Sequence, residues 1–434
     1  MVSLGCPKNQ CDAELMLHKI SLAGYRLVNE PGKADVVIIN TCGFIQSAKE
    51  EAIEEIFEAI NRKKDGINKK IIVTGCLAQR YFDEMEKEFP EVDGVLSIGR
   101  NDDIVEAVNT VILDRRAILQ ANADKHNMEG ERQLSTLSHY AYLRIADGCD
   151  NCCSYCAIPI IRGRFRSRRM ENIIKEAEGL AQKGVKELII VAQDTTRYGL
   201  DLYGELKLYE LLNKLCEVNE IKWIRLLYCY PERITDELIE VIKEQPKILK
   251  YLDMPIQHCN EEILSRMNRT GSNLTLYNLV GKLRRNIQGL VLRSTVLAGF
   301  PDESEEQFIE LAEFVNNVKF EHLGCFPYSE EEGTVAAEMP YQVNEKERLH
   351  RAEIIVEQQE IRAAEFWQSL IGREFEVVVE GYDRYLEMYF GRSYMMAPEI
   401  DGMIYFTGDG LKISDFINVK IIDVSDNNLI GESG

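Results

Sequence analysis

Residues 148–168 read GCDNCCSYCAIPIIRGRFRSR, and this stretch sets the expectation for the whole chain. Cys149, Cys153 and Cys156 follow one another with C-x-x-x-C-x-x-C spacing. Three thiolates in one short loop can hold three irons of a 4Fe–4S cube. A zinc knuckle is the alternative, but zinc usually requires a fourth ligand, and Cys152 could provide it only with strained geometry beside Cys153. The sequence therefore predicts an iron–sulfur cluster on Cys149, Cys153 and Cys156.

Six strand-like segments recur around and after this loop, with helical segments between them. They read YLRIADG (142–148), ELIIVAQD (187–194), WIRLLYC (223–229), YLDMPIQ (251–257), LRSTVLAG (292–299) and HLGCFPYS (322–329). Repeated βα units predict a parallel sheet, and six of them predict a partial (β/α)6 barrel over residues 138–370. The cysteine loop follows the first strand, so the iron without a protein ligand can bind the amino and carboxylate groups of S-adenosylmethionine. Electron transfer from the cluster would then split this cofactor and yield a 5′-deoxyadenosyl radical.

Residues 1–115 alternate apolar β-branched runs with helical segments, which is typical of a doubly wound parallel sheet. Cys6, Cys42 and Cys76 each end one of the first three expected strands. Because ligands gather outside the carboxyl ends of parallel strands, we expect these three thiols to converge. Three separate buried thiols are the alternative. The pattern favours a second 4Fe–4S cluster, with Cys11 one helical turn beyond Cys6 and pointing elsewhere.

The remaining residues divide into a connection and a small terminal domain. Residues 116–137 contain few large apolar side chains and are predicted to form a linker. Residues 371–434 contain short alternating strands separated by Gly and Asp turns, which predict a small antiparallel β-barrel. The predicted fold class is α/β, with a parallel N-terminal sheet, a central partial barrel and this terminal barrel.

Composition narrows the classes of partner. The 434 residues include 51 Lys and Arg against 72 Asp and Glu, a net charge of −21. Such a surface repels phosphate backbones and attracts basic partners, so nucleic acid is unlikely as the main substrate. The sequence has no apolar run of membrane-spanning length and no secretory signal at its start, so we expect a cytoplasmic protein without a membrane partner. Twelve cysteines in such a chain are expected to be reduced thiols or metal ligands.

These motifs resemble the methylthiotransferases, a family of radical S-adenosylmethionine enzymes, and the resemblance extends over essentially the whole chain. It implies an N-terminal methylthiotransferase domain, a radical domain and a C-terminal TRAM barrel. It also implies that Cys6, Cys42 and Cys76 hold a second 4Fe–4S cluster that carries the sulfur for the substrate. A low-potential electron donor such as flavodoxin or ferredoxin is implied as a partner.

Several further stretches look most like the branch of this family that modifies a ribosomal protein. They read VSLGCPKN (2–9), NTCGFI (40–45), AQDTTRYGLD (192–201), DMPIQH (253–258), PYSEEEGT (327–334) and RSYMMAPEIDG (392–402). The resemblance implies a methylthio group added to the β-carbon of an aspartate in small-subunit ribosomal protein twelve. The same chemistry on a tRNA adenosine is the alternative.

The charge of the terminal barrel favours a protein substrate. From Gly372 onward the chain has five Lys or Arg and twelve Asp or Glu, a net charge of −7. A barrel that binds RNA should be basic, whereas an acidic barrel suits a very basic ribosomal protein. The alternative is that this charge only aids solubility.

Five residues are predicted to contact the cofactor. The resemblance implies that Tyr155 seats S-adenosylmethionine and that Gln193 lies near its methionine part, although Asp194 beside it could simply cap a helix. Arg293 could bind the cofactor carboxylate, or it could form a structural ion pair. Gly299 and Pro301 would shape the turn beside the adenine.

Two further features depart from the simple pattern. The segment GFPDES (299–304) has Asp302 where the family usually has Gly and Ser304 where it usually has Thr. The run of arginines after the cysteine loop, which includes Arg162, is either a solvated loop or a site for anionic groups.

Overall fold

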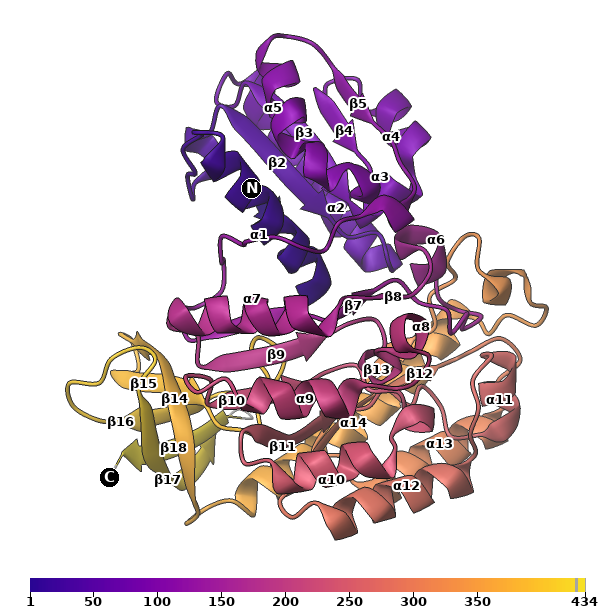
Figure 1. Ribbon diagram of the computed structural model, residues 1–434. Helices are drawn as coiled ribbons and strands as arrows, with labels where there is room; N and C mark the ends of the chain where they lie inside the picture. The colour runs from indigo at the N-terminus through magenta and orange to yellow at the C-terminus, as the bar shows by residue number, and fades with distance from the viewer. Residues whose placement is uncertain (426–427, 434) are drawn as a thin grey trace.

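The structure is a computed structural model that describes residues 1–425 and 428–433. Figure 1 shows an N-terminal domain (indigo to purple) above a central domain, with a small barrel (yellow) at the lower left. Within the described residues, no helix is both long and apolar enough to cross a membrane.

The N-terminal domain is a five-stranded parallel sheet whose strands lie in chain order, with helices on both faces. The strands are β1 (Val2–Ser3), β2 (Val36–Thr41), β3 (Lys70–Gly75), β4 (Gly94–Leu96) and β5 (Ala117–Leu119). The helices are α1 (Pro7–Leu22), α2 (Gln46–Lys64), α3 (Cys76–Arg80), α4 (Phe82–Glu88) and α5 (Ile104–Ile112). Side chains of α2 and α4 pack on one face of the sheet, and those of α1 and α5 pack on the other. The parallel α/β architecture predicted for this part of the chain is confirmed.

The fifth strand lies among residues predicted to form a linker. Ala117, Ile118 and Leu119 pair in parallel with β4 and so complete the sheet edge. Three apolar residues are too few to show a strand period in the sequence, and only the exposed edge of β4 makes them a strand. The linker proper therefore starts after Leu119 and includes short turns up to the central domain.

The central domain is an open parallel sheet of six strands, as predicted. The strands are β6 (Tyr140–Arg144), β9 (Glu187–Val191), β10 (Trp223–Leu226), β11 (Ile248–Asp253), β12 (Val291–Ala298) and β13 (His322–Pro327), in spatial order β13-β12-β11-β10-β9-β6. The helices are α6 (Ile158–Arg162), α7 (Met170–Gln182), α8 (Leu200–Tyr203), α9 (Leu208–Cys216), α10 (Asp236–Glu244), α11 (Glu261–Arg266), α12 (Asn273–Asn286), α13 (Glu305–Val318) and α14 (Glu345–Gln368). A short hairpin of β7 (Ala146–Asp147) and β8 (Arg166–Ser167) encloses the cysteine loop.

The C-terminal domain is a closed barrel with strand order β14-β15-β16-β18-β17. Its strands are β14 (Glu374–Asp383), β15 (Met388–Arg392), β16 (Ile404–Thr407), β17 (Phe416–Ser425) and β18 (Asn428–Ser433). The barrel was predicted to be antiparallel, but β16 and β18 pair in parallel. Strand directions cannot alternate all the way around a closed ring of five, so at least one neighbouring pair must be parallel.

The barrel packs against side chains from the concave face of the central sheet. The ring of Trp223 meets that of Phe416 edge-on, with centroids 4.9 Å apart. Beneath them, the fully buried carboxylate of Glu187 accepts hydrogen bonds from Arg225 Nε and, across the domain boundary, from Arg392 Nη2, each at 2.8 Å. A buried carboxylate between two buried guanidinium groups fixes the barrel to the sheet.

We expect Glu187→Gln to lower the midpoint of thermal unfolding markedly, since breaking a buried ion pair leaves an unpaired charge and costs about 3–5 kcal/mol. Glu376→Gln is the matched control, because Glu376 pairs with Lys222 across the same boundary at 2.6 Å while both side chains are 41% exposed. Such a surface pair is worth about 1 kcal/mol or less. Equal losses in the two variants would contradict this argument.

The ion pairs of Glu187 with Arg392 and Arg225 also predict that the stability of the fold depends on pH. Burial raises the pKa of Glu187, but Arg392 and Arg225 outweigh it and bring the pKa to about 2, from 4.5 for a free group. A carboxylate with a lowered pKa stabilises the fold above pH 4.5 and loses this effect as the pH falls toward 2. The difference in unfolding midpoint between the wild type and Glu187→Gln should therefore shrink below pH 4.5.

Candidate active site

The tight cysteine group lies in the loop between β7 and α6, at the carboxyl end of β6. Cys149 and Cys153 are buried, Cys156 is half-buried, and Cys152 is exposed. The loop depends on Gly148, which has φ +76° and whose hypothetical Cβ would lie 2.1 Å from the carbonyl oxygen of Arg164. No other residue fits there, because any side chain would collide with the backbone of the returning strand.

The chemistry of this loop fits a cluster of iron and sulfur. Burial raises the pKa of the Cys149 thiol to about 11 and raises that of Cys156 as well, with neighbouring thiols adding to both effects. The backbone N–H of Ile158 lies 3.5 Å from Cys156 Sγ and can donate to a thiolate. Since burial raises these pKa values, the thiols become thiolates readily only when a cation binds, as in metal sites.

Among the described residues, no three or more His, Cys, Asp or Glu side chains form a group that could hold a metal ion. A group of that kind is what a single metal ion requires, because its ligands lie within about 2.3 Å of one centre. A 4Fe–4S cube instead takes each thiolate on a different corner iron. The zinc alternative therefore gains no support, and the cluster ligands stay a prediction.

The residues predicted to contact the cofactor lie around this loop at the carboxyl ends of the strands, with Arg293 as the exception. Gln193 donates to Asp147 Oδ1 at 2.8 Å, and its own Oε1 is buried without a hydrogen-bond partner. That orphaned acceptor suits an ammonium or hydroxyl donor of a cofactor. Tyr155 packs against the cluster of Phe300 and Tyr328. The turn at Gly299 and Pro301 has φ +75° at the glycine, whose N–H donates to Glu303.

Two residues that differ from the family pattern are compatible with the same backbone. Asp302 adopts φ +60°, a conformation that favours glycine, and its carboxylate accepts from Arg266 at 2.9 Å. Ser304 caps α13 through a reciprocal capping box with Gln307. Asp194, for its part, is a cap: its side chain accepts the backbone N–H of Arg197 and also a hydrogen bond from Asn151 in the cysteine loop.

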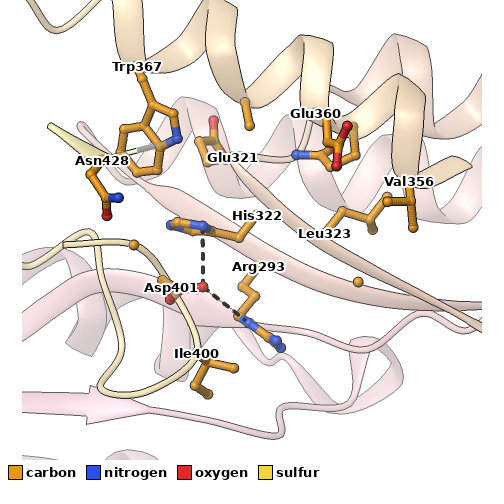
Figure 2. Close-up of a pocket in the computed structure, with 14 residues that line it drawn as sticks. Arg293, Glu321, His322, Leu323, Val356, Glu360, Trp367, Ile400, Asp401 and Asn428 are labelled. Carbon is orange, nitrogen blue, oxygen red and sulfur yellow. Dashed lines mark ion pairs between the residues drawn. The ribbon is translucent and has the colours of Figure 1, made fainter. Parts of the chain in front are cut away.

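Arg293 lies near the start of β12, away from the loop, beside a cavity of about 410 Å³ between the central domain and the C-terminal barrel. Its guanidinium pairs with Asp253 at 3.2 Å and with Asp401 at 3.5 Å. Figure 2 shows Arg293 and His322 both directed at Asp401. Arg293 thus forms the structural ion pairs weighed as its alternative, and a contact with the cofactor stays a prediction.

The three N-terminal cysteines converge at the carboxyl edge of the first sheet, as expected. Cys6 follows β1, Cys42 follows β2, and Cys76 begins α3 directly after β3. Glycines let their turns pack closely: a Cβ on Gly5 would lie 2.8 Å from the Cβ of Cys42, and one on Gly75 would lie 2.6 Å from the nitrogen of Thr41. Side chains at these two positions would force the three cysteine turns apart.

The electrostatic environment differs among these thiols. Burial raises the pKa of Cys42, and it raises the pKa of Cys76 to about 12. Burial also opposes ionisation of Cys6, but Lys8 and Arg162 outweigh it, so the pKa of Cys6 is lowered. Cys11 lies apart, as expected, with its thiol against the carbonyl oxygen of Tyr142 and Arg132.

One buried network connects the N-terminal cysteines to the helix that follows the loop of Cys149, Cys153 and Cys156, here called the radical loop. Arg162, at the end of that helix, donates to Cys76 Sγ at 3.4 Å and to Asp12 Oδ2 at 2.6 Å. Asp12 also pairs with Arg144 and, at 2.7 Å, with His126. Sequence reasoning placed Arg162 only in a basic run, because nothing in the residue order separates the buried Arg162 and Arg168 from the exposed Arg164 and Arg169.

The comparisons with known families agree with the three domains. Residues 1–97 match the model described as uncharacterized protein family UPF0004, residues 143–315 match the Radical SAM superfamily, and residues 371–433 match the TRAM domain. Membership of the Radical SAM superfamily implies S-adenosylmethionine and a 4Fe–4S cluster as cofactors. A solved structure of the methyltransferase TsrM from Kitasatospora setae, with cobalamin and a [4Fe-4S] cluster, is similar in fold, with a TM-score of 0.54 and 13% identity over 76% of this chain and 74% of that chain.

Curated relatives match over their full length. One from Clostridium botulinum (strain Hall), named ribosomal protein uS12 methylthiotransferase RimO, is 47% identical over 99% of this chain and 97% of that protein. Another of that name, from Caldanaerobacter subterraneus subsp. tengcongensis, is 48% identical over 100% of this chain and 99% of that protein. This chain therefore belongs to the RimO family of radical S-adenosylmethionine methylthiotransferases.

Proposed function

We propose that this enzyme adds a methylthio group to the β-carbon of an aspartate in ribosomal protein uS12, using two 4Fe–4S clusters. The observation that carries the proposal is the presence of two cysteine groups at strand ends, with Arg162 from the helix after one group donating to Cys76 of the other. One group of thiols suits generation of a radical, and a second group supports a separate source of sulfur. The names of relatives at 47% identity support uS12 as the target.

The proposed roles follow from where each group lies. When bound, the cluster on Cys149, Cys153 and Cys156 with one S-adenosylmethionine would supply a radical that removes hydrogen from the substrate carbon. The second cluster would supply the sulfur, and a second S-adenosylmethionine would supply the methyl group. Gln193 would accept a hydrogen bond from the cofactor through its free Oε1. Arg162 would hold Cys76 in place and offset its negative charge as a ligand.

The remaining partners are also proposals. A low-potential donor such as flavodoxin or ferredoxin would reduce the radical cluster, in the cytoplasm. The C-terminal barrel has a net charge of −7, which supports attraction of a basic ribosomal protein and would repel tRNA. A tRNA adenosine is the competing substrate.

Cysteine substitutions should separate the two clusters. Cys149→Ala or Cys156→Ala should abolish formation of 5′-deoxyadenosine, because the radical cluster loses a ligand. Cys42→Ala or Cys76→Ala should leave that reaction largely intact and abolish methylthiolation. Chromatographic assay of 5′-deoxyadenosine and mass spectrometry of a uS12 peptide measure the two effects, and iron analysis shows whether a cluster is lost.

Cys152→Ala is the matched control, since Cys152 lies in the same loop but is exposed. It should retain both reactions and the full iron content. Wild-type protein that reconstitutes with only one 4Fe–4S cluster per chain, or a Cys42→Ala variant that still methylthiolates, would refute the two-cluster proposal.

The substrate can be identified in cells that lack the gene. We expect uS12 from the deletion strain to lack one methylthio group on an aspartate, and plasmid-borne wild-type protein to restore it. The methylthiolated adenosines of tRNA should be unchanged. The reverse pattern, with intact uS12 and unmodified tRNA, would establish the tRNA alternative.

A further inference from the structure

Lys8 is a buried lysine with no carboxylate beside it, and it lies between the two cysteine groups. It is the second residue of α1, two positions after Cys6, and only 7% of its surface is exposed. Its ammonium lies 3.6 Å from the centroid of the Tyr228 ring in the central domain. Among the described residues, no carboxylate lies within 4.0 Å of it. Lysine is almost never this buried unless it is paired.

The contact that the structure gives the Lys8 ammonium is the ring of Tyr228. The face of an aromatic ring attracts a cation, but only as a partial replacement for an anion. A buried lysine with no carboxylate beside it therefore suits an anionic group that binds from outside the chain.

Tyr228 is itself held in a strained conformation. Its φ is +60°, which non-glycine residues seldom adopt. The backbone N–H of Tyr228 donates to Asp253 at 3.0 Å, and Asp253 is paired with Arg293. Strain of this kind clusters at functional sites, where surrounding interactions stabilise it. It is an observation independent of the charge on Lys8.

The segment that carries Tyr228 also reaches the radical loop. The hydroxyl of Tyr230, two residues further on, lies 3.9 Å from Cys153 Sγ. Lys8 therefore stands close to Cys6 on one side and, through Tyr228 and Tyr230, to the cysteines of the radical loop on the other. A group bound by Lys8 would lie between the proposed source of sulfur and the proposed source of the radical.

We propose that Lys8 binds the side-chain carboxylate of the substrate aspartate and that Tyr228 is the positioning residue for Lys8. This inference rests on the proposed function and names the residue that selects the substrate side chain. In aspartate, the carbon to be modified is bonded directly to that carboxylate. Anchoring the carboxylate therefore places the β-carbon within about one bond length of a fixed point. An adenine base offers no carboxylate to this cation.

The test is the equilibrium binding of two uS12 peptides to the reconstituted enzyme, one with the target aspartate and one with asparagine in its place. The wild type should bind the aspartate peptide about 30-fold or more tightly, as expected when one partner of a buried charge pair is removed. Lys8→Met should bind both peptides equally. Lys19→Met is the matched control, because Lys19 lies on the same helix but pairs with Asp102 at the surface, and this variant should discriminate like the wild type.

Two further measurements distinguish recognition from damage. Iron content and uncoupled formation of 5′-deoxyadenosine are measured in Lys8→Met and in Lys8→Arg, so that loss of a cluster is told apart from loss of recognition. Tyr228→Phe, which keeps the ring, should preserve the discrimination between the peptides, whereas Tyr228→Leu should weaken it.

The outcomes separate the inference from the proposed function. Wild-type protein that binds both peptides equally, or a Lys8→Met variant that still prefers aspartate, would overturn the role of Lys8. If Lys8→Met loses iron, the wild-type comparison and Lys8→Arg, which should keep part of the preference, decide the question. Failure of the wild type to methylthiolate the aspartate peptide would instead count against the proposed function.

Discussion

The arrangement of the site depends on one buried carboxylate. Asp12 lies on α1, fully enclosed, and is paired with Arg144 from the central sheet and Arg162 from the helix after the radical loop, with a hydrogen bond to His126 from the linker. Taking these charges out of water is favourable only while all of them are paired, because a single unpaired buried charge costs several kcal/mol. The network therefore allows one position of the N-terminal domain on the central domain. That position sets where the start of α1, with Cys6, meets the radical loop.

The two sheets meet through their functional edges. In each, the cysteines follow the carboxyl ends of parallel strands, where backbone turns leave room for a ligand. Glycine at positions 5, 75 and 148 permits these turns to pack closely. Burial raises the pKa of several of these thiols, so assembly of the proposed clusters would release protons.

The features that depend on a local pattern could be predicted from the sequence alone. Spacing predicted the cysteine loop, the repeated βα units predicted the open sheet of six strands, and cysteines at strand ends predicted the converging turns. Other features depend on contacts between distant segments. The short strand β5 exists because β4 offers an unpaired edge, and the parallel pair β16–β18 follows from closing a ring of five strands. The distinct roles of Arg162 and Lys8 depend on burial, which is settled only when two domains meet.

The proposed substrate protein is basic overall, but the residue proposed to be modified is acidic. The chain has negative charge that would attract the protein at long range and a buried lysine that would attract the residue at short range. The C-terminal barrel, with a net charge of −7, can attract a basic protein over about 8–10 Å of physiological solution before any contact forms. The same negative charge would repel an aspartate side chain taken on its own. At short range Lys8 would instead favour an acidic group, because the low dielectric around this buried side chain strengthens its attraction for one carboxylate. Long-range attraction would thus select the protein, and Lys8 would select the residue.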